Sequence, residues 1–259
     1  VNSANNQLGN LLVERARIKM EQAKRPKADK AALQAAARQQ YDEAYKVFTR
    51  AQNDLKERLL KMKVVDPKDT KTTDLRDQLR ADYLQVQLLG AAVREETAET
   101  VAKGSPDHTT MLTESAAQYG EVYDKYRTRL AGLYARMYQG RCMQKLGKLK
   151  EALTFFGELL EQPDNPEEFR ALKSKTMQLA AQAWMASKPA LYQEAIKWLE
   201  PWIENARPHE SKQPEWLELR LALAEAQWAQ AEAAKKAKGG DPQAKRWESE
   251  ARKNALFVS

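Results

Sequence analysis

Apolar residues recur every three to four positions along most of the chain, and charged or amide residues fill the positions between them. The series Tyr41, Ala44, Phe48 and Ala51 shows this spacing, which is that of one face of an α-helix. The alternation of apolar and polar residues that marks a half-buried β-strand does not persist in any segment. The pattern therefore predicts an all-helical protein.

Prolines, glycines and polar clusters separate the helical segments. We expect Asp29 to cap a helix that runs to Met62, Asp74 to cap the next one, and a further helix to begin near Thr109 and continue almost unbroken to Gly147. Short turns favour antiparallel packing of sequence neighbours. The chain is thus predicted to form a single domain, residues 1–259, of about five antiparallel helical hairpins, at about 7–62, 74–128, 130–161, 167–206 and 214–256.

The central hairpin carries small and aromatic residues at positions where two helices would touch. Gly140 lies in the middle of its first helix, Gly147 precedes the turn, and the second helix holds Ala152 and Phe156. Glycine and alanine let helix backbones approach closely, and an aromatic ring can fill the space beside them. This pattern resembles the tetratricopeptide repeat, a helix–turn–helix unit of about 34 residues.

Two weaker copies of the pattern support the resemblance. One is formed by Ala183, Tyr192, Ala195 and Leu199, and the other by Tyr41, Ala44, Phe48 and Ala51. The hairpins at about 74–128 and 214–256 keep little of the consensus. The resemblance implies an α-solenoid, a right-handed superhelix with a concave groove, formed by a divergent member of the family with overlong helices.

Signals of catalysis are nearly absent from the sequence. His108 and His209 each lie in a polar or proline-rich break, without a second histidine at helical spacing, and no phosphate-binding glycine motif is present. Cys142 lies beside Gly140 and is expected to be a small, buried or half-buried packing residue. The acidic cluster of Glu95, Glu96 and Glu99 is expected to be a solvated helix face. We therefore predict no enzyme activity, no cofactor and no metal site.

The resemblance also implies where a partner would bind, because the first helices of such repeats line the groove. Residues next to the small position, or on neighbouring turns of that face, are candidates for contact with a protein or peptide that has apolar anchors and acidic flanks. The candidate groove residues are Tyr134, Met137, Arg141, Gln144, Lys145, Trp184 and Lys188.

Net charge leaves a second hypothesis open. The formal charge is +7, and lysines cluster at several points along the chain, so a basic surface could bind nucleic acid or another anionic partner. In the sequence, however, the aromatic residues do not interleave with the basic clusters as they would on a base-stacking platform, which disfavours nucleic acid. A third alternative is that the chain spaces or assembles parts of a larger protein.

The sequence fixes neither compartment nor oligomeric state. No segment is apolar over the length that a membrane-spanning helix needs. The chain begins with Val1 and carries no leader-like segment, so we expect it to be part of a longer protein. Its composition suits the bacterial cytoplasm and periplasm equally.

Overall fold

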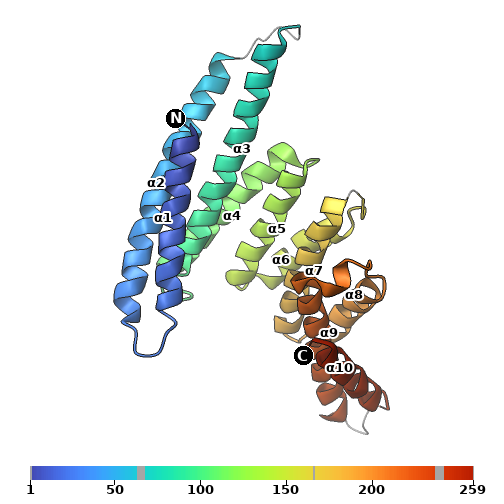
Figure 1. Cartoon of the computed structure of the whole chain (residues 1–259). Coiled ribbons are helices and arrows are strands. Elements are labelled where there is room, and N and C mark those ends of the chain that lie inside the picture. Colours follow the sequence, from blue (N-terminus) through green and yellow to red (C-terminus); the bar gives the residue numbers. More distant parts are fainter. Residues whose placement is uncertain (1, 63–67, 166, 237–241, 259) are drawn as a thin grey trace. The chain divides into compact units, whose positions relative to one another are not determined.

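The computed structural model describes residues 2–62, 68–165, 167–236 and 242–258 (Figure 1). Within these residues the chain forms α-helices and one short 3-10 turn, η1, and no strand. The all-helical prediction is therefore confirmed. The helices are α1 (Asn2–Gln22), α2 (Lys30–Lys61), α3 (Thr70–Ala98), α4 (Pro106–Tyr126), α5 (Leu130–Lys145), α6 (Leu149–Leu160), α7 (Glu167–Ala186), α8 (Tyr192–Glu204), η1 (Glu210–Lys212), α9 (Pro214–Lys236) and α10 (Ala244–Val258).

Contacts divide the chain, which we predicted to be a single domain, into two compact units. Unit 1 comprises residues 1–127 and unit 2 comprises residues 128–259. In unit 1, α1 packs on α2, α2 on α3, and α3 on α4. In unit 2 the helices pack as three hairpins, α5–α6, α7–α8 and α9–α10. The first helices of successive hairpins also contact each other, α5 with α7 and α7 with α9.

The core of unit 1 depends on a close approach between α1 and α2. The ring of Phe48, which is buried, lies over Gly9 so closely that a Cβ atom on Gly9 would be 2.5 Å from it. Asp29 caps α2 as predicted, since its side chain accepts a hydrogen bond from the Ala32 backbone N–H at 3.0 Å. The buried core residues of this unit are Val13, Ala16, Ala37, Tyr41, Ala44, Phe48, Ala51, Leu55, Leu79, Tyr83, Val86 and Val93.

Two predicted helix starts were a few residues late. Asp69, not Asp74, caps α3, because its carboxylate accepts hydrogen bonds from both the backbone N–H and the hydroxyl of Thr72. Ser105 caps α4 and Pro106 occupies its first turn, where a missing N–H costs nothing. In both cases the capping residue lies upstream of the predicted start and satisfies one of the first free N–H groups.

Unit 2 repeats the close approach seen in unit 1. A Cβ atom on Gly140 of α5 would lie 2.5 Å from the ring of Phe156 on α6. Gly147 ends the hairpin's first helix with a φ of 77°, as the sequence predicted. Cys142, two residues further along α5, is fully buried. Phe156 belongs to the core that α6 forms with α7, α8 and α9. Other members of this core are Ala152, Met177, Ala180, Ala183, Ala195, Leu199, Leu219 and Leu223.

The described helices include none that is both long enough and apolar enough to cross a bilayer.

Candidate interaction face

One exposed stripe runs along each first helix of unit 2. On α5 it consists of half-exposed residues, and on α7 and α9 of exposed or half-exposed ones, at spacings of three and four. Residues at these spacings lie on one side of a helix. The stripes together are called the first-helix face, and its members are Tyr134, Tyr138, Arg141 and Lys145 on α5, Ala171, Lys175, Gln178 and Gln182 on α7, and Glu218, Leu221 and Glu225 on α9.

Side-chain contacts join the three stripes into one surface. The Lys175 ammonium lies 5.9 Å from the centroid of the Tyr134 ring, which links α7 to α5. The Gln178 side-chain amide donates a hydrogen bond of 2.7 Å to Glu218, which links α7 to α9. A shallow hollow of about 330 Å³ lies between the three helices and is lined by Met137, Tyr138, Arg141, Lys175, Gln178, Leu179, Pro214, Glu215 and Glu218.

Tyr134 and Arg141, two of the three predicted groove residues that lie on this face, flank an aromatic residue that the prediction missed. Tyr138 lies one turn from Tyr134, their ring centroids are 6.2 Å apart, and the Arg141 guanidinium lies 4.5 Å from the Tyr138 centroid. The spacing of Tyr134, Tyr138 and Arg141 by four and three residues was the signal in the sequence that pointed to Tyr138. Burial raises the pKa of Tyr134, and the neighbouring Tyr138 raises it further.

Three more predicted residues lie on α5 with different degrees of access. Met137 is buried at 2% exposure and forms the floor of the hollow, so it supports the face without presenting much surface. Lys145 is half-exposed and continues the stripe. Gln144 is half-exposed as a residue, but its side-chain oxygen is buried without a hydrogen-bond partner.

The two remaining predicted residues lie elsewhere. The Trp184 ring stacks on that of Trp198 in α8, with centroids 6.3 Å apart, and packs against the core of the unit. Trp184 follows Lys175 by nine residues, which is about half a turn away on a helix that advances about 100° per residue. Lys188 lies in the α7–α8 turn, where it borders a separate hollow of about 780 Å³ next to the α5–α6 turn.

The α9 side of the first-helix face is acidic and partly apolar. None of its residues was among the predicted groove residues. Glu215, Glu218 and Glu225 are exposed on α9. Leu221 is 43% exposed and Trp228, two turns further along, is 44% exposed. The sequence signal was present in the spacing of Glu218, Leu221, Glu225 and Trp228, but the repeat consensus is degenerate in this hairpin and gave no register to follow.

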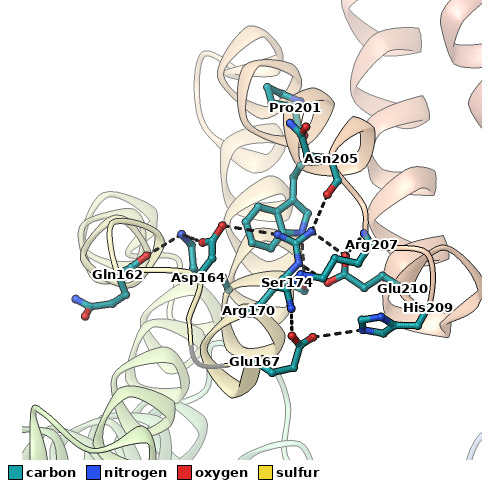
Figure 2. Close-up of polar contacts among 12 residues, drawn as sticks. Gln162, Asp164, Glu167, Arg170, Ser174, Pro201, Asn205, Arg207, His209 and Glu210 are labelled. Carbon is teal, nitrogen blue, oxygen red and sulfur yellow. Dashed lines mark hydrogen bonds and ion pairs between the residues drawn. The ribbon is translucent and has the colours of Figure 1, made fainter.

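A second polar cluster in unit 2 surrounds Arg170 of α7 (Figure 2). Its guanidinium pairs with both oxygens of Glu210 and donates to the backbone carbonyl of Asn205 at 3.1 Å. The same group lies 3.7 Å from Asp164 and 4.4 Å from the centroid of the Trp202 ring. Arg170 thereby ties α7 to the end of α8, to η1 and to the α6–α7 connection.

This cluster also contains the described residues whose geometry is closest to a metal site. Ligand atoms of Glu167, His209 and Glu210 lie within 4.8 Å of one another. However, Glu210 already pairs with Arg170 and accepts from the Arg207 backbone N–H at 2.6 Å, while Glu167 pairs with the Arg207 side chain. Two guanidinium groups beside the carboxylates would repel a metal cation, so these contacts hold loops together.

The same pairing sets the charge of Glu210. Burial alone would raise the pKa of this carboxyl, but the hydrogen bonds from the Arg170 guanidinium and from the Arg207 backbone outweigh burial, and the pKa lies below its ordinary value. Hydrogen bonding to Glu210 also raises the pKa of Arg170. Both groups therefore stay charged over the whole neutral range.

In unit 1 only Glu99 of the acidic cluster is exposed as expected; Glu95 is buried and Glu96 half-buried, and the prediction is corrected for these two. Glu95 is 1% exposed, and the Tyr119 hydroxyl lies 3.5 Å from its carboxylate. Glu96 accepts hydrogen bonds from the Arg17 guanidinium at 2.9 Å and from the Tyr41 hydroxyl at 3.0 Å. Burial raises the pKa of Tyr41, and Glu96 adds to this shift. These carboxylates thus connect α3 to α1, α2 and α4.

Comparison of the chain with known protein families, curated proteins and solved structures gives no match.

Proposed function

We propose that this protein is a non-catalytic interaction scaffold of the tetratricopeptide-like kind, and that unit 2 binds a segment of a partner protein on its first-helix face. The observation that carries the proposal is the alignment of three successive first helices, each of which turns a largely polar stripe away from the core, with two tyrosines on the α5 stripe. Binding surfaces on repeat proteins are built in this way, one short stripe per repeat.

The chemical composition of the face supports a protein as the partner. Tyrosine and arginine are enriched where proteins bind one another, and here Tyr134, Tyr138 and Arg141 are neighbours. The rings are also packed against cations of the same face. Side chains held by such neighbours lose little conformational freedom on binding.

The alternative of a nucleic-acid surface is less well supported. Arg141, Lys145 and Lys175 could contact phosphates, but Glu215, Glu218 and Glu225 are exposed near them on α9. Carboxylates at this position would repel a polyanion and offset the attraction of the three cations.

Site-specific photo-crosslinking tests the proposal. Gln182 on α7 and Gln193 on α8 are both exposed glutamines in one hairpin, and only Gln182 belongs to the first-helix face. Each is replaced in turn by a photoreactive amino acid, and the full chain is irradiated in a lysate of its source organism at low and at high salt. We expect a discrete protein adduct from position 182, retained at high salt, and none from position 193.

The proposal fails if position 182 gives no protein adduct, or if both positions give the same adducts. A crosslink to nucleic acid that disappears at high salt would support the alternative instead. The Arg141→Glu variant serves as a second control, since it should remove the adduct at position 182 while leaving the helical content of the chain unchanged.

A further inference from the structure

Charge on the first-helix face is arranged in order across the helices. The α5 stripe carries Arg141 and Lys145, and the neighbouring α7 stripe carries Lys175. In the first half of α9, Glu218 and Glu225 belong to the face and Glu215 borders its hollow, and all three are exposed. Because α5 packs on α7 and α7 on α9, the face changes from basic to acidic in one direction.

The exposed apolar side chains also differ between the basic and the acidic side of the face. The aromatic residues on the basic side, Tyr134 and Tyr138, are half-exposed and have cations close to their rings. The exposed aliphatic surface lies on the acidic side, where Leu221 is flanked by Glu218 and Glu225. A ligand therefore meets different chemistry at the two ends of the face.

We infer that the first-helix face selects a partner segment by its charge polarity. The segment lies across the three helices with acidic residues against α5 and α7, and with basic residues and a bulky apolar residue against α9. This inference rests on the proposed function, and it adds both the chemistry of the partner and the direction in which it binds. Complementary charges at the edge of an interface govern orientation and specificity more than affinity.

The order of charges also disfavours other occupants. A uniformly acidic ligand would meet the carboxylates of α9, and a uniformly basic one would meet Arg141, Lys145 and Lys175. Like charges brought together in an interface oppose binding. A segment that carries both charges, in the order opposite to that of the face, avoids this repulsion at both ends.

Selection from a library of random twelve-residue peptides displayed on phage tests this inference. The full chain is immobilised, and enriched peptides are sequenced. We expect acidic residues to concentrate in one half of the enriched peptides, and basic residues with a Leu-, Phe- or Trp-type anchor in the other. A photoreactive group at the acidic end of such a peptide should crosslink to α5 or α7, and one at the basic end should crosslink to α9.

A charge-swapped chain provides the matched control. It carries Arg141→Glu, Lys175→Glu, Glu218→Lys and Glu225→Lys, which keeps the net charge and exchanges the two ends of the face. Peptides selected by the original chain should bind it about tenfold more weakly or worse. Selection on the swapped chain should give peptides that bind in the opposite direction, with their acidic end crosslinked to α9.

Each outcome decides between the inference and the proposed function. Enriched peptides without charge polarity, or the same direction of binding on both chains, would overturn the inference and leave the scaffold function standing. Absence of any enriched peptide would overturn the inference, and the crosslinks in lysate would then decide on the scaffold separately. Concentration-dependent self-association of the full chain that is lost on Arg141→Glu would identify a second copy as the occupant, and would also overturn it.

Discussion

The ring of Phe156 lies against Gly140 with no room for a side chain between them. A Cβ atom on Gly140 would lie 2.5 Å from Cε1 of the ring, well inside van der Waals contact, and Phe156 itself is fully buried. The same relationship joins Gly9 and Phe48 in unit 1, again at 2.5 Å. Each unit therefore contains one helical hairpin in which glycine permits an aromatic ring to fill the interhelical space.

We predict that Gly140→Ala destabilises unit 2 by about 1–3 kcal/mol, because the buried ring has to move to accept the added methyl group. This is opposite to the effect of glycine to alanine in an open helix position, which stabilises by up to about 1 kcal/mol. Gly157 on α6 has no atoms near the position of an added Cβ, so Gly157→Ala is the matched control. Denaturant unfolding followed by tryptophan fluorescence measures both variants, and equal effects of the two would contradict the prediction.

A second prediction separates the two roles that tryptophan has in unit 2. Trp184→Ala should destabilise the unit by about 1–3 kcal/mol, since it removes the stack on Trp198 and leaves a gap beside the core. Trp228→Ala should change stability by less than about 1 kcal/mol, because the residue is 44% exposed. Chemical unfolding followed by circular dichroism gives the comparison. If Trp184→Ala were neutral for stability, its packing role would be excluded.

The third prediction concerns Arg170. Arg170→Met should cost about 2–4 kcal/mol in the free energy of unfolding of unit 2, because it removes the guanidinium that neutralises the Glu210 carboxylate and donates to the Asn205 carbonyl. The double variant Arg170→Met, Glu210→Gln should recover part of this loss, since the unpaired carboxylate is removed as well. A double variant no more stable than Arg170→Met alone would show that the carboxylate is not the source of the penalty.

Acid should weaken the same cluster. The folded state holds the pKa of Glu210 below the ordinary value of 4.5. The ionised carboxylate therefore stabilises the fold above pH 4.5, and this contribution is lost as the pH falls through the lowered pKa. The stability difference between the original chain and Glu210→Gln should accordingly be constant near neutral pH and shrink in acid. Unfolding curves measured over a series of acidic pH values test this, and a difference that grows in acid would contradict it.

Glu200 of α8 is predicted to behave in the opposite way. Burial raises the pKa of this carboxyl, and the neighbouring Glu250 and Glu204 raise it further. Because the folded state favours the protonated form, the charge opposes folding above the raised pKa. Glu200→Gln should therefore stabilise unit 2 at neutral pH, by less than about 1 kcal/mol owing to solvent screening, and have little effect once Glu200 is protonated in both states. A destabilised variant at neutral pH would instead mean that the hydrogen bond from Gln227 to Glu200 outweighs the charge.

Much of the fold could be predicted from local sequence. The cap predicted at Asp29 and the helix end predicted at Gly147 are both seen in the structure, because glycine and capping residues act through their own backbone. Gly140 and Phe156 could be recognised as partners because small and aromatic residues at these spacings meet across a hairpin. The position of a cap was less certain, since Asp69 and Asp74 are equally good capping residues and only the structure shows which one binds the backbone of Thr72.

The candidate face was only partly predictable for a different reason. Tyr134 and Arg141 were assigned from the central hairpin, and both lie on the first-helix face. Trp184 was assigned by matching Ala183 to Gly140, and the inter-repeat segment is longer than standard, so the register had already changed by the time the chain reached α7. Glu95 was missed because its partners are distant in sequence: Tyr119 lies 24 residues away, in the next helix.

Cys142 can serve as a probe for the separation of α5 from the helices packed around it. Its thiol is the single one in the sequence and is fully buried on α5, two residues from Gly140. A thiol reagent in solution can reach it only when α5 separates from its neighbours, so the rate of labelling reports how often that separation occurs. Labelling measured with and without a bound partner would then show whether the first-helix face is fixed before binding or becomes fixed on binding.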